Sequence, residues 1–224
     1  MKKHGWIHAG LTLVLMIAIP GFAAGQEKQD QPPEGMSPQE SAEMAAWEKA
    51  AAPGPNHELL SDFVGTWDTK VQVWMGPDPD PQESSGKSEN RWVLGKRYLH
   101  STYEGEAMGG PFHGIGYTGY DNIEKKFVTV WMDTMSTTFM VEKGDYDPST
   151  RTFTYYSEYK DPMGNKVLGK SRVRVLGKDK HIVTMWHKKG DADYEKVLEI
   201  TYTRSKSSAE TGDSQKKEIA TASP

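Results

Sequence analysis

His100 and Glu104 are a pair of residues whose side chains could pass a proton to and from a substrate. They lie four positions apart in a segment where alternate residues share one face of a predicted β-strand, so both would face the same way. An imidazole and a carboxylate are the groups used in general acid and base catalysis. The sequence otherwise lacks enzyme motifs, since it contains no Gly-x-Ser-x-Gly and no His-Glu-x-x-His. An enzyme that uses this pair as catalytic residues is therefore an alternative hypothesis.

A second set of residues has the chemistry of a binding site for a small molecule. Tyrosine and tryptophan rings offer apolar area with a polar tip, and an arginine or an aspartate can hold one polar end of a ligand. The residues that combine these properties on the predicted strands are Arg97, Tyr98, Tyr117, Trp131, Asp133 and Trp186. If such side chains fill the interior solidly, the protein would instead be a structural or protein-binding barrel.

The histidines and the absence of cysteine limit the metal chemistry that the chain could support. The histidines beyond the N-terminal segment form no His-x-His or His-x-x-x-His pair; they are His57, His100, His113, His181 and His187. With no cysteine in the sequence, disulfides, thiolate metal sites and a cysteine nucleophile are excluded. We therefore predict no metal site and no bound cofactor.

The elements that must position these residues are β-strands. From Trp67 to Arg204, polar and apolar residues alternate in short segments that end at turn residues such as Gly95-Lys96 and Asp147-Pro148. The pattern predicts about ten strands, and no apolar repeat of helical length interrupts them. Short turns between consecutive strands favour an up-and-down antiparallel sheet, and closure into a barrel would remove its edges. The fold class is therefore all-β, with a barrel wide enough to hold a small ligand.

The stretch Leu59–Trp67 predicts the floor of this barrel. Asn56 can cap one helical turn, and Gly65 gives the backbone the freedom to pass from that turn into a strand. Trp67 would then cover the closed end of the barrel, with its indole N–H bonded to a nearby carbonyl. Farther along, glycines 114, 116 and 119 break up one strand and indicate a close approach of a side chain, a backbone or a ligand.

The two ends of the chain lie outside the predicted barrel, which spans residues 56–205. Residues 1–25 resemble a cleavable signal peptide, with Lys2-Lys3, an apolar run shorter than the roughly 20 residues of a membrane span, and Ala23-Ala24-Gly25. Residues 26–55 form a polar linker, in which Ser37-Pro38-Gln39-Glu40 predicts a capped helix over about residues 38–51. Residues 206–224 are rich in Ser, Lys, Glu and Thr, and we expect them to be disordered.

The overall charge argues against nucleic acid as a partner. The formal net charge is −4, and removal of Lys2 and Lys3 with residues 1–25 changes it to −6. A surface of this sign repels a phosphate backbone. We predict a protein secreted to the periplasm of a bacterium, with no membrane span after cleavage; the sequence leaves the oligomeric state open.

Several short motifs occur in an order that resembles a known family. They are Gly65-Thr66-Trp67, Leu94-Gly95-Lys96-Arg97-Tyr98-Leu99, the segment 114–122 and Trp131-Met132-Asp133-Thr134-Met135. Together they resemble the bacterial DUF1579 family and, more broadly, the calycin superfamily of lipocalin-like barrels. The resemblance implies a barrel and supplies no reaction. Some calycin-like barrels hold haem through one inward histidine, which makes His187 a haem candidate.

The sequence-based hypothesis is a barrel that binds a small, largely apolar or amphipathic molecule in its interior. The glycine-rich strand would let that ligand approach the wall of the barrel. The alternatives that remain open are an enzyme with an acid and base pair inside the barrel and a barrel with a filled core.

Overall fold

A computed structural model describes residues 36–76 and 80–206 of the chain, and the following elements lie within these ranges. The N-terminal elements are α1 (Pro38–Ala51), α2 (Pro55–Glu58) and the 3₁₀ turn η1 (Leu59–Phe63). The strands are β1 (Gly65–Val73), β2 (Gln82–Val93), β3 (Tyr98–Ala107), β4 (Gly110–Asp121), β5 (Lys126–Asp133), β6 (Met140–Asp147), β7 (Thr152–Lys160), β8 (Lys166–Gly177), β9 (Lys180–Lys189) and β10 (Glu195–Arg204).

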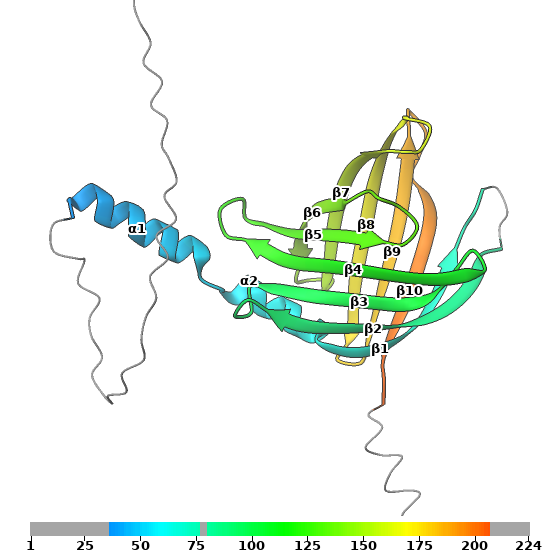
Figure 1. The fold of residues 1–224 in the computed structure, drawn as a ribbon, viewed down its shortest axis with the longest axis horizontal. Helices are drawn as coiled ribbons and strands as arrows, with labels where there is room; N and C mark the ends of the chain where they lie inside the picture. The colour runs from blue at the N-terminus through cyan, green and yellow to red at the C-terminus, as the bar shows by residue number, and fades with distance from the viewer. Residues whose placement is uncertain (1–35, 77–79, 207–224) are drawn as a thin grey trace, which may run out of the picture. The chain divides into compact units, whose positions relative to one another are not determined.

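Within the described residues the ten strands form a closed antiparallel barrel in which each strand pairs with its neighbours in sequence and β1 pairs with β10. This confirms the predicted all-β, up-and-down barrel and its strand number. Figure 1 shows β2 to β5 running across the view, with β8 to β10 crossing behind them at a steep angle. Closure satisfies the backbone groups of both outer strands, so β1 and β10 leave no sheet edge between them.

The floor of the barrel has the predicted helical turn and Trp67, but Asn56 is not the helix cap, because α2 begins at Pro55 with Gly54 as its N-cap. Gly65 has a φ of 123°, a conformation that L side chains rarely adopt, and the chain turns there from η1 into β1. Trp67 follows it and is 1% exposed, and its indole N–H donates a hydrogen bond of 2.8 Å to the carbonyl of Phe63. Leu60 and Phe63 of η1 pack into the core cluster, so one turn of 3₁₀ helix closes this end of the interior.

α1 begins at the predicted capping box. The Ser37 backbone N–H donates to the Glu40 carboxylate (2.8 Å), and the Glu40 N–H donates back to the Ser37 hydroxyl (3.3 Å). At the other end of α1, Arg97 donates to the carbonyl of Ala51, and Asn122 donates to that of Ala50. The predicted signal peptide (1–25) and all of the predicted C-terminal tail (206–224) beyond Lys206 lie outside the described residues, within which no helix has the length and hydropathy of a membrane span.

Arg204, at the end of β10, ties the last strand to the floor. Its guanidinium donates to the carbonyls of Val64 (2.7 Å), Asp62 (3.1 Å) and Lys178 (2.7 Å). The same guanidinium lies 4.2 Å from the centroid of the Trp67 ring, a cation–π distance. Arg204 therefore joins η1, β1, β10 and the β8–β9 turn at the seam where the barrel closes.

We expect Arg204→Ala to lower the free energy of unfolding by about 2–4 kcal/mol, because it removes several charged hydrogen bonds and the contact with Trp67. Urea denaturation followed by circular dichroism measures the change. Arg174→Ala is the matched control, since Arg174 is exposed on β8 and has no ion-pair partner among the described residues; its effect should stay within about 0.5 kcal/mol. Equal effects of the two substitutions would contradict the role of Arg204 at the seam.

Candidate functional site

The interior of the barrel contains a cavity of about 170 Å³. Its wall includes aromatic rings from η1 and from strands on both sides of the barrel, with methionines and small hydroxyl residues between them. The aromatic members include Trp131, Phe153, Tyr155 and Tyr202, and the polar members include Glu142 and Ser171. Because the interior keeps this space, the alternative of a solidly filled barrel does not describe the structure.

Trp131 forms one wall of the cavity from β5, as the sequence hypothesis placed it. Its ring lies against Gly114 and Gly116 of β4, where a Cβ atom would collide with the indole. The ring N–H donates a 3.0 Å hydrogen bond to Asp133, whose other carboxylate oxygen accepts from the backbone of Met135. Asp133 therefore orients the indole and is not among the lining residues, and the space left by the glycines is filled by Trp131 rather than by a ligand.

The polar centre of the cavity is Glu142 of β6, which is 4% exposed. Its Oε1 accepts hydrogen bonds from Ser171 (2.8 Å) and Ser157 (3.3 Å). Burial raises the pKa of the Glu142 carboxyl above its usual value, against the lowering effect of the two serines. The nearby carboxyl in turn raises the pKa of Tyr155, after burial as the larger cause. Among the described lining residues Glu142 is the one acid, and none is Lys or Arg.

His181 of β9 closes the floor side of the cavity. Its ring stacks on Tyr202 at 4.4 Å between centroids and meets the edges of Phe63 (5.0 Å) and Trp67 (4.5 Å). Burial, and secondarily the charge of Arg204, lowers the pKa of His181 to about 3. The imidazole is therefore neutral at physiological pH and serves as part of the aromatic wall.

Three residues assigned to the ligand site lie on the outer face of the barrel, which corrects that part of the prediction. Tyr98 and Tyr117 are 44% and 42% exposed, and neither lines the cavity. Trp186 faces outward from β9, where Lys170 lies 5.2 Å from its ring centroid. On β3, β4 and β9 the residues of opposite parity face inward. Leu99, Gly116 and Met185 line the cavity.

Arg97 also lies outside the cavity, in the turn between β2 and β3. It donates to the carbonyls of Ala51 and Leu94, so it holds the end of α1 and the turn rather than a ligand. Of the residues proposed for the binding site, Trp131 therefore lines the cavity, and Asp133 accepts a hydrogen bond from its indole.

The proposed catalytic pair is separated by the geometry of the strand. His100 lies on the outer face of β3 beside Tyr117, with ring centroids 4.9 Å apart, and Glu104 is exposed on the same face. Four residues of an extended strand span about 13 Å, which is too far for the two side chains to share a proton with one reacting group. The pair does not form an acid and base site inside the barrel.

His187, the haem candidate, faces inward on β9 but is not part of the cavity wall. Its ring shares a hydrogen bond of 3.1 Å with the Tyr159 hydroxyl, and burial lowers its pKa. A porphyrin is several times larger than the single aromatic ring that a cavity of about 170 Å³ can take, so the cavity does not fit haem. Across residues 36–76 and 80–206 no group of three or more His, Asp or Glu side chains could hold a metal ion.

Sequence reasoning missed Glu142 and Ser171. The signal for Glu142 was its position between Met140 and Tyr146 on one face of a strand, since an acid flanked by apolar neighbours of the same parity is a candidate for burial. Ser171 shares a face with Val167 and Val173 in the same way. Each signal required a prior decision about which face of the strand is inside.

The fold and the cavity define a small antiparallel β-barrel with an internal cavity that carries one buried acid. Residues 52–204 match the model of the family described as "Protein of unknown function (DUF1579)". The chain belongs to the DUF1579 family, which confirms the resemblance seen in its motifs. A comparison with curated proteins found no match.

Two solved structures are similar to this chain. The crystal structure of Rv2717c from M. tuberculosis is 15% identical with a TM-score of 0.51, over 69% of this chain and 100% of that chain. The "Structure of EF1p2_mFAP2b bound to DFHBI" is 12% identical with a TM-score of 0.37, over 66% of this chain and 98% of that chain. At these identities the likeness to Rv2717c concerns the fold alone, and the second likeness is too low to support an argument.

We expect His181→Phe to change how stability depends on pH. In the unfolded chain His181 takes up a proton near pH 6.5, whereas in the folded chain its pKa is about 3. Because protonation favours the unfolded state, the free energy of unfolding decreases as pH falls below 6.5. Between pH 7 and pH 5 this loss amounts to about 2 kcal/mol, and it should be absent from the variant.

Urea denaturation at both pH values measures this change, and the comparison between proteins isolates the imidazole. Glu142, whose raised pKa acts in the opposite direction, is present in both. His113→Phe, at an exposed position on β4, is the control that should keep the wild-type pH dependence. If His181→Phe and His113→Phe show the same change between pH 7 and pH 5, the buried imidazole is not the cause.

Proposed function

We propose that this DUF1579 protein binds one small, largely apolar molecule in the interior of its barrel. The observation that supports the proposal is the cavity of about 170 Å³, walled by aromatic rings and reached by one buried carboxyl group. Binding sites for small molecules commonly combine a mostly apolar wall with a few placed polar groups.

The volume of the cavity limits the size of the ligand. A protein cavity of about 150 Å³ lined by apolar side chains can hold benzene. The ligand that fits this barrel is therefore a compact molecule, of about one aromatic ring with a short substituent. A long acyl chain or a fused ring system would require the side chains of the wall to move.

The wall can contact such a ring from several sides. Trp131 is held by its hydrogen bond to Asp133 and by its contact with the β4 glycines, so its orientation is fixed before a ligand binds. Phe153 is 1% exposed and lies in contact with Phe63, Phe127 and Tyr146. A preorganised wall of this kind reduces the entropy lost on binding.

We also propose that the protein acts outside the cytoplasm, in the periplasm of a bacterium. The support for this is the sequence of residues 1–25, with its basic start, its apolar run and its small residues before Gln26. A chain without cysteine depends on its core alone in that compartment, and the closed barrel provides such a core.

Trp131→Ala should remove the bound molecule, because it deletes one wall of the cavity. Native mass spectrometry of the protein purified from its own host should show a small molecule near one per chain in the wild type and none in the variant. The variant should lose only about 1–3 kcal/mol of stability, since the indole is half-buried.

Trp186→Ala is the matched control for this experiment, as it removes a tryptophan from the outer face of the barrel. It should retain the bound molecule. A wild-type protein without any bound mass, or equal occupancy in the two variants, would argue against a ligand in this cavity.

Export predicts a processed N-terminus. Purification from the native host followed by N-terminal sequencing should find a chain that starts close to Gln26, recovered in the periplasmic or secreted fraction. Substitution of Leu13 and Leu15 by aspartate should block processing, because it interrupts the apolar run. An unprocessed wild-type chain in the cytoplasmic fraction would contradict export.

A further inference from the structure

The carboxyl group of Glu142 has one oxygen that the protein does not use. Both serine hydroxyls donate to Oε1, and Oε2 accepts no hydrogen bond from the described residues. Within residues 36–76 and 80–206, Ser205 Oγ is the one side-chain N or O atom that is fully enclosed and has no hydrogen-bond partner. Because Oε2 of Glu142 also has no partner, it is not fully enclosed and contacts open space, although Glu142 as a whole is 4% exposed. Because Glu142 lines the cavity, that space is the cavity itself.

Aromatic residues flank this carboxyl on both neighbouring strands. On β5, Thr129 is directly opposite Glu142, which places Trp131 on the diagonal. On β7, Tyr155 is opposite Gly144, so its ring lies on the other diagonal from Glu142. Diagonal side chains are about 7–8 Å apart at the backbone, within reach of aromatic rings. The rings of Trp131 and Tyr155 can therefore reach a group that binds at Oε2.

Among the described residues that line the cavity with Glu142, none is Lys or Arg. β8 contributes Ser171 from the inside, while its Lys170 and Arg172 lie on the outer face over Trp186. The other titratable groups toward this side are Tyr155 and Tyr159 of β7, Asp133 of β5, and His187 of β9, which is bonded to Tyr159. An ionised carboxylate here has hydrogen bonds but no counter-ion from the protein.

We infer that the ligand carries an organic ammonium group and that Glu142 is its counter-ion. This inference rests on the proposed function and specifies the chemical class of the ligand. A carboxylate between aromatic rings suits a cation with an apolar body, because the rings attract the positive charge through their π faces while the carboxylate neutralises it. The ammonium would also stabilise the ionised form of a buried acid that otherwise favours protonation.

Ligands of opposite charge fit this cavity poorly. A carboxylate or a phosphate would face Glu142 with no Lys or Arg among the described lining residues to offset the repulsion. A neutral alcohol could donate one hydrogen bond to Oε2, but it would gain nothing from the charge. The order of affinity expected for ligands of equal size is therefore amine, then alcohol, then acid.

Isothermal titration calorimetry at pH 8 with benzylamine, benzyl alcohol and benzoate tests this order. All three probes carry one aromatic ring of the size the cavity accepts. In the wild-type protein, benzylamine should bind at least tenfold more tightly than benzyl alcohol, and benzoate should not bind. In Glu142→Gln, benzylamine should lose at least tenfold in affinity while benzyl alcohol changes less than twofold.

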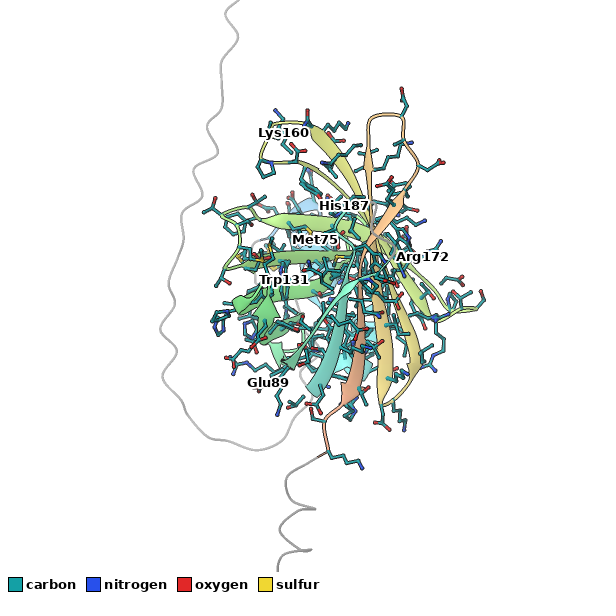
Figure 2. The ribbon with its side chains drawn as sticks, turned by 90° about the vertical axis from the view of Figure 1, so that its right-hand side faces the viewer. Met75, Glu89, Trp131, Lys160, Arg172 and His187 are labelled. Carbon is teal, nitrogen blue, oxygen red and sulfur yellow. The ribbon has the colours of Figure 1, made fainter. Side chains whose placement is uncertain are left out.

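The control variant is Glu89→Gln, which removes an exposed carboxylate from the outer face of β2 (Figure 2). It should leave both affinities unchanged. Equal loss of benzylamine affinity in both variants would mean that surface charge, rather than Glu142, attracts the amine. Thermal denaturation of Glu142→Gln verifies the fold, since the amide oxygen can still accept from Ser171 and Ser157.

The outcomes separate the two levels of the proposal. If benzyl alcohol and benzylamine bind equally well, the cavity is a binding site but the ammonium inference is wrong. If benzoate binds more tightly than benzylamine, the inference is also wrong. If none of the three probes binds to the wild-type protein, the proposed function itself fails for ligands of this size.

Discussion

The contact between Arg204 and Trp67 at the barrel seam is the constraint on which the interior depends. It fixes the end of β10 against the start of β1 and, through the carbonyls of Asp62 and Val64, holds η1 across the opening. With η1 in place, Leu60 and Phe63 pack into the core cluster and line the cavity, so this end of the barrel is closed. A barrel of ten strands is otherwise wide enough to admit water from both ends.

The interior is then a low-dielectric space in which each ionisable group is either neutral or supported. His181 remains neutral among aromatic rings, and Asp133 is bonded to the Trp131 indole and to a backbone N–H. Glu142 differs from both, because its partners are two serine hydroxyls on a single oxygen. Glu142 is also the one acid among the described residues that line the cavity.

The sequence predicted the barrel, its floor and the helix cap, because these depend on alternation, turn residues and capping, which are local properties. It predicted the lining poorly, since alternation separates two faces without saying which is inside. On β4 the usual rule that large apolar residues face inward fails: Ile115 and Tyr117 are exposed, while Gly114 and Gly116 are inside. Glycine is required at these inward positions because the Trp131 ring of the neighbouring strand occupies the space of a side chain. This contact is tertiary and cannot be seen in the local sequence pattern.

Glu142 is a poor choice for stability alone. A glutamine would accept from the same two serines without the cost of desolvating a charge, and a methionine would fill the space without any polar group. An acid with an unused oxygen toward a cavity contributes to stability only weakly, because its ionised form lacks a counter-ion in the fold. Its presence is better explained by a partner that the fold does not contain, and the aromatic rings around it indicate that this partner is positively charged.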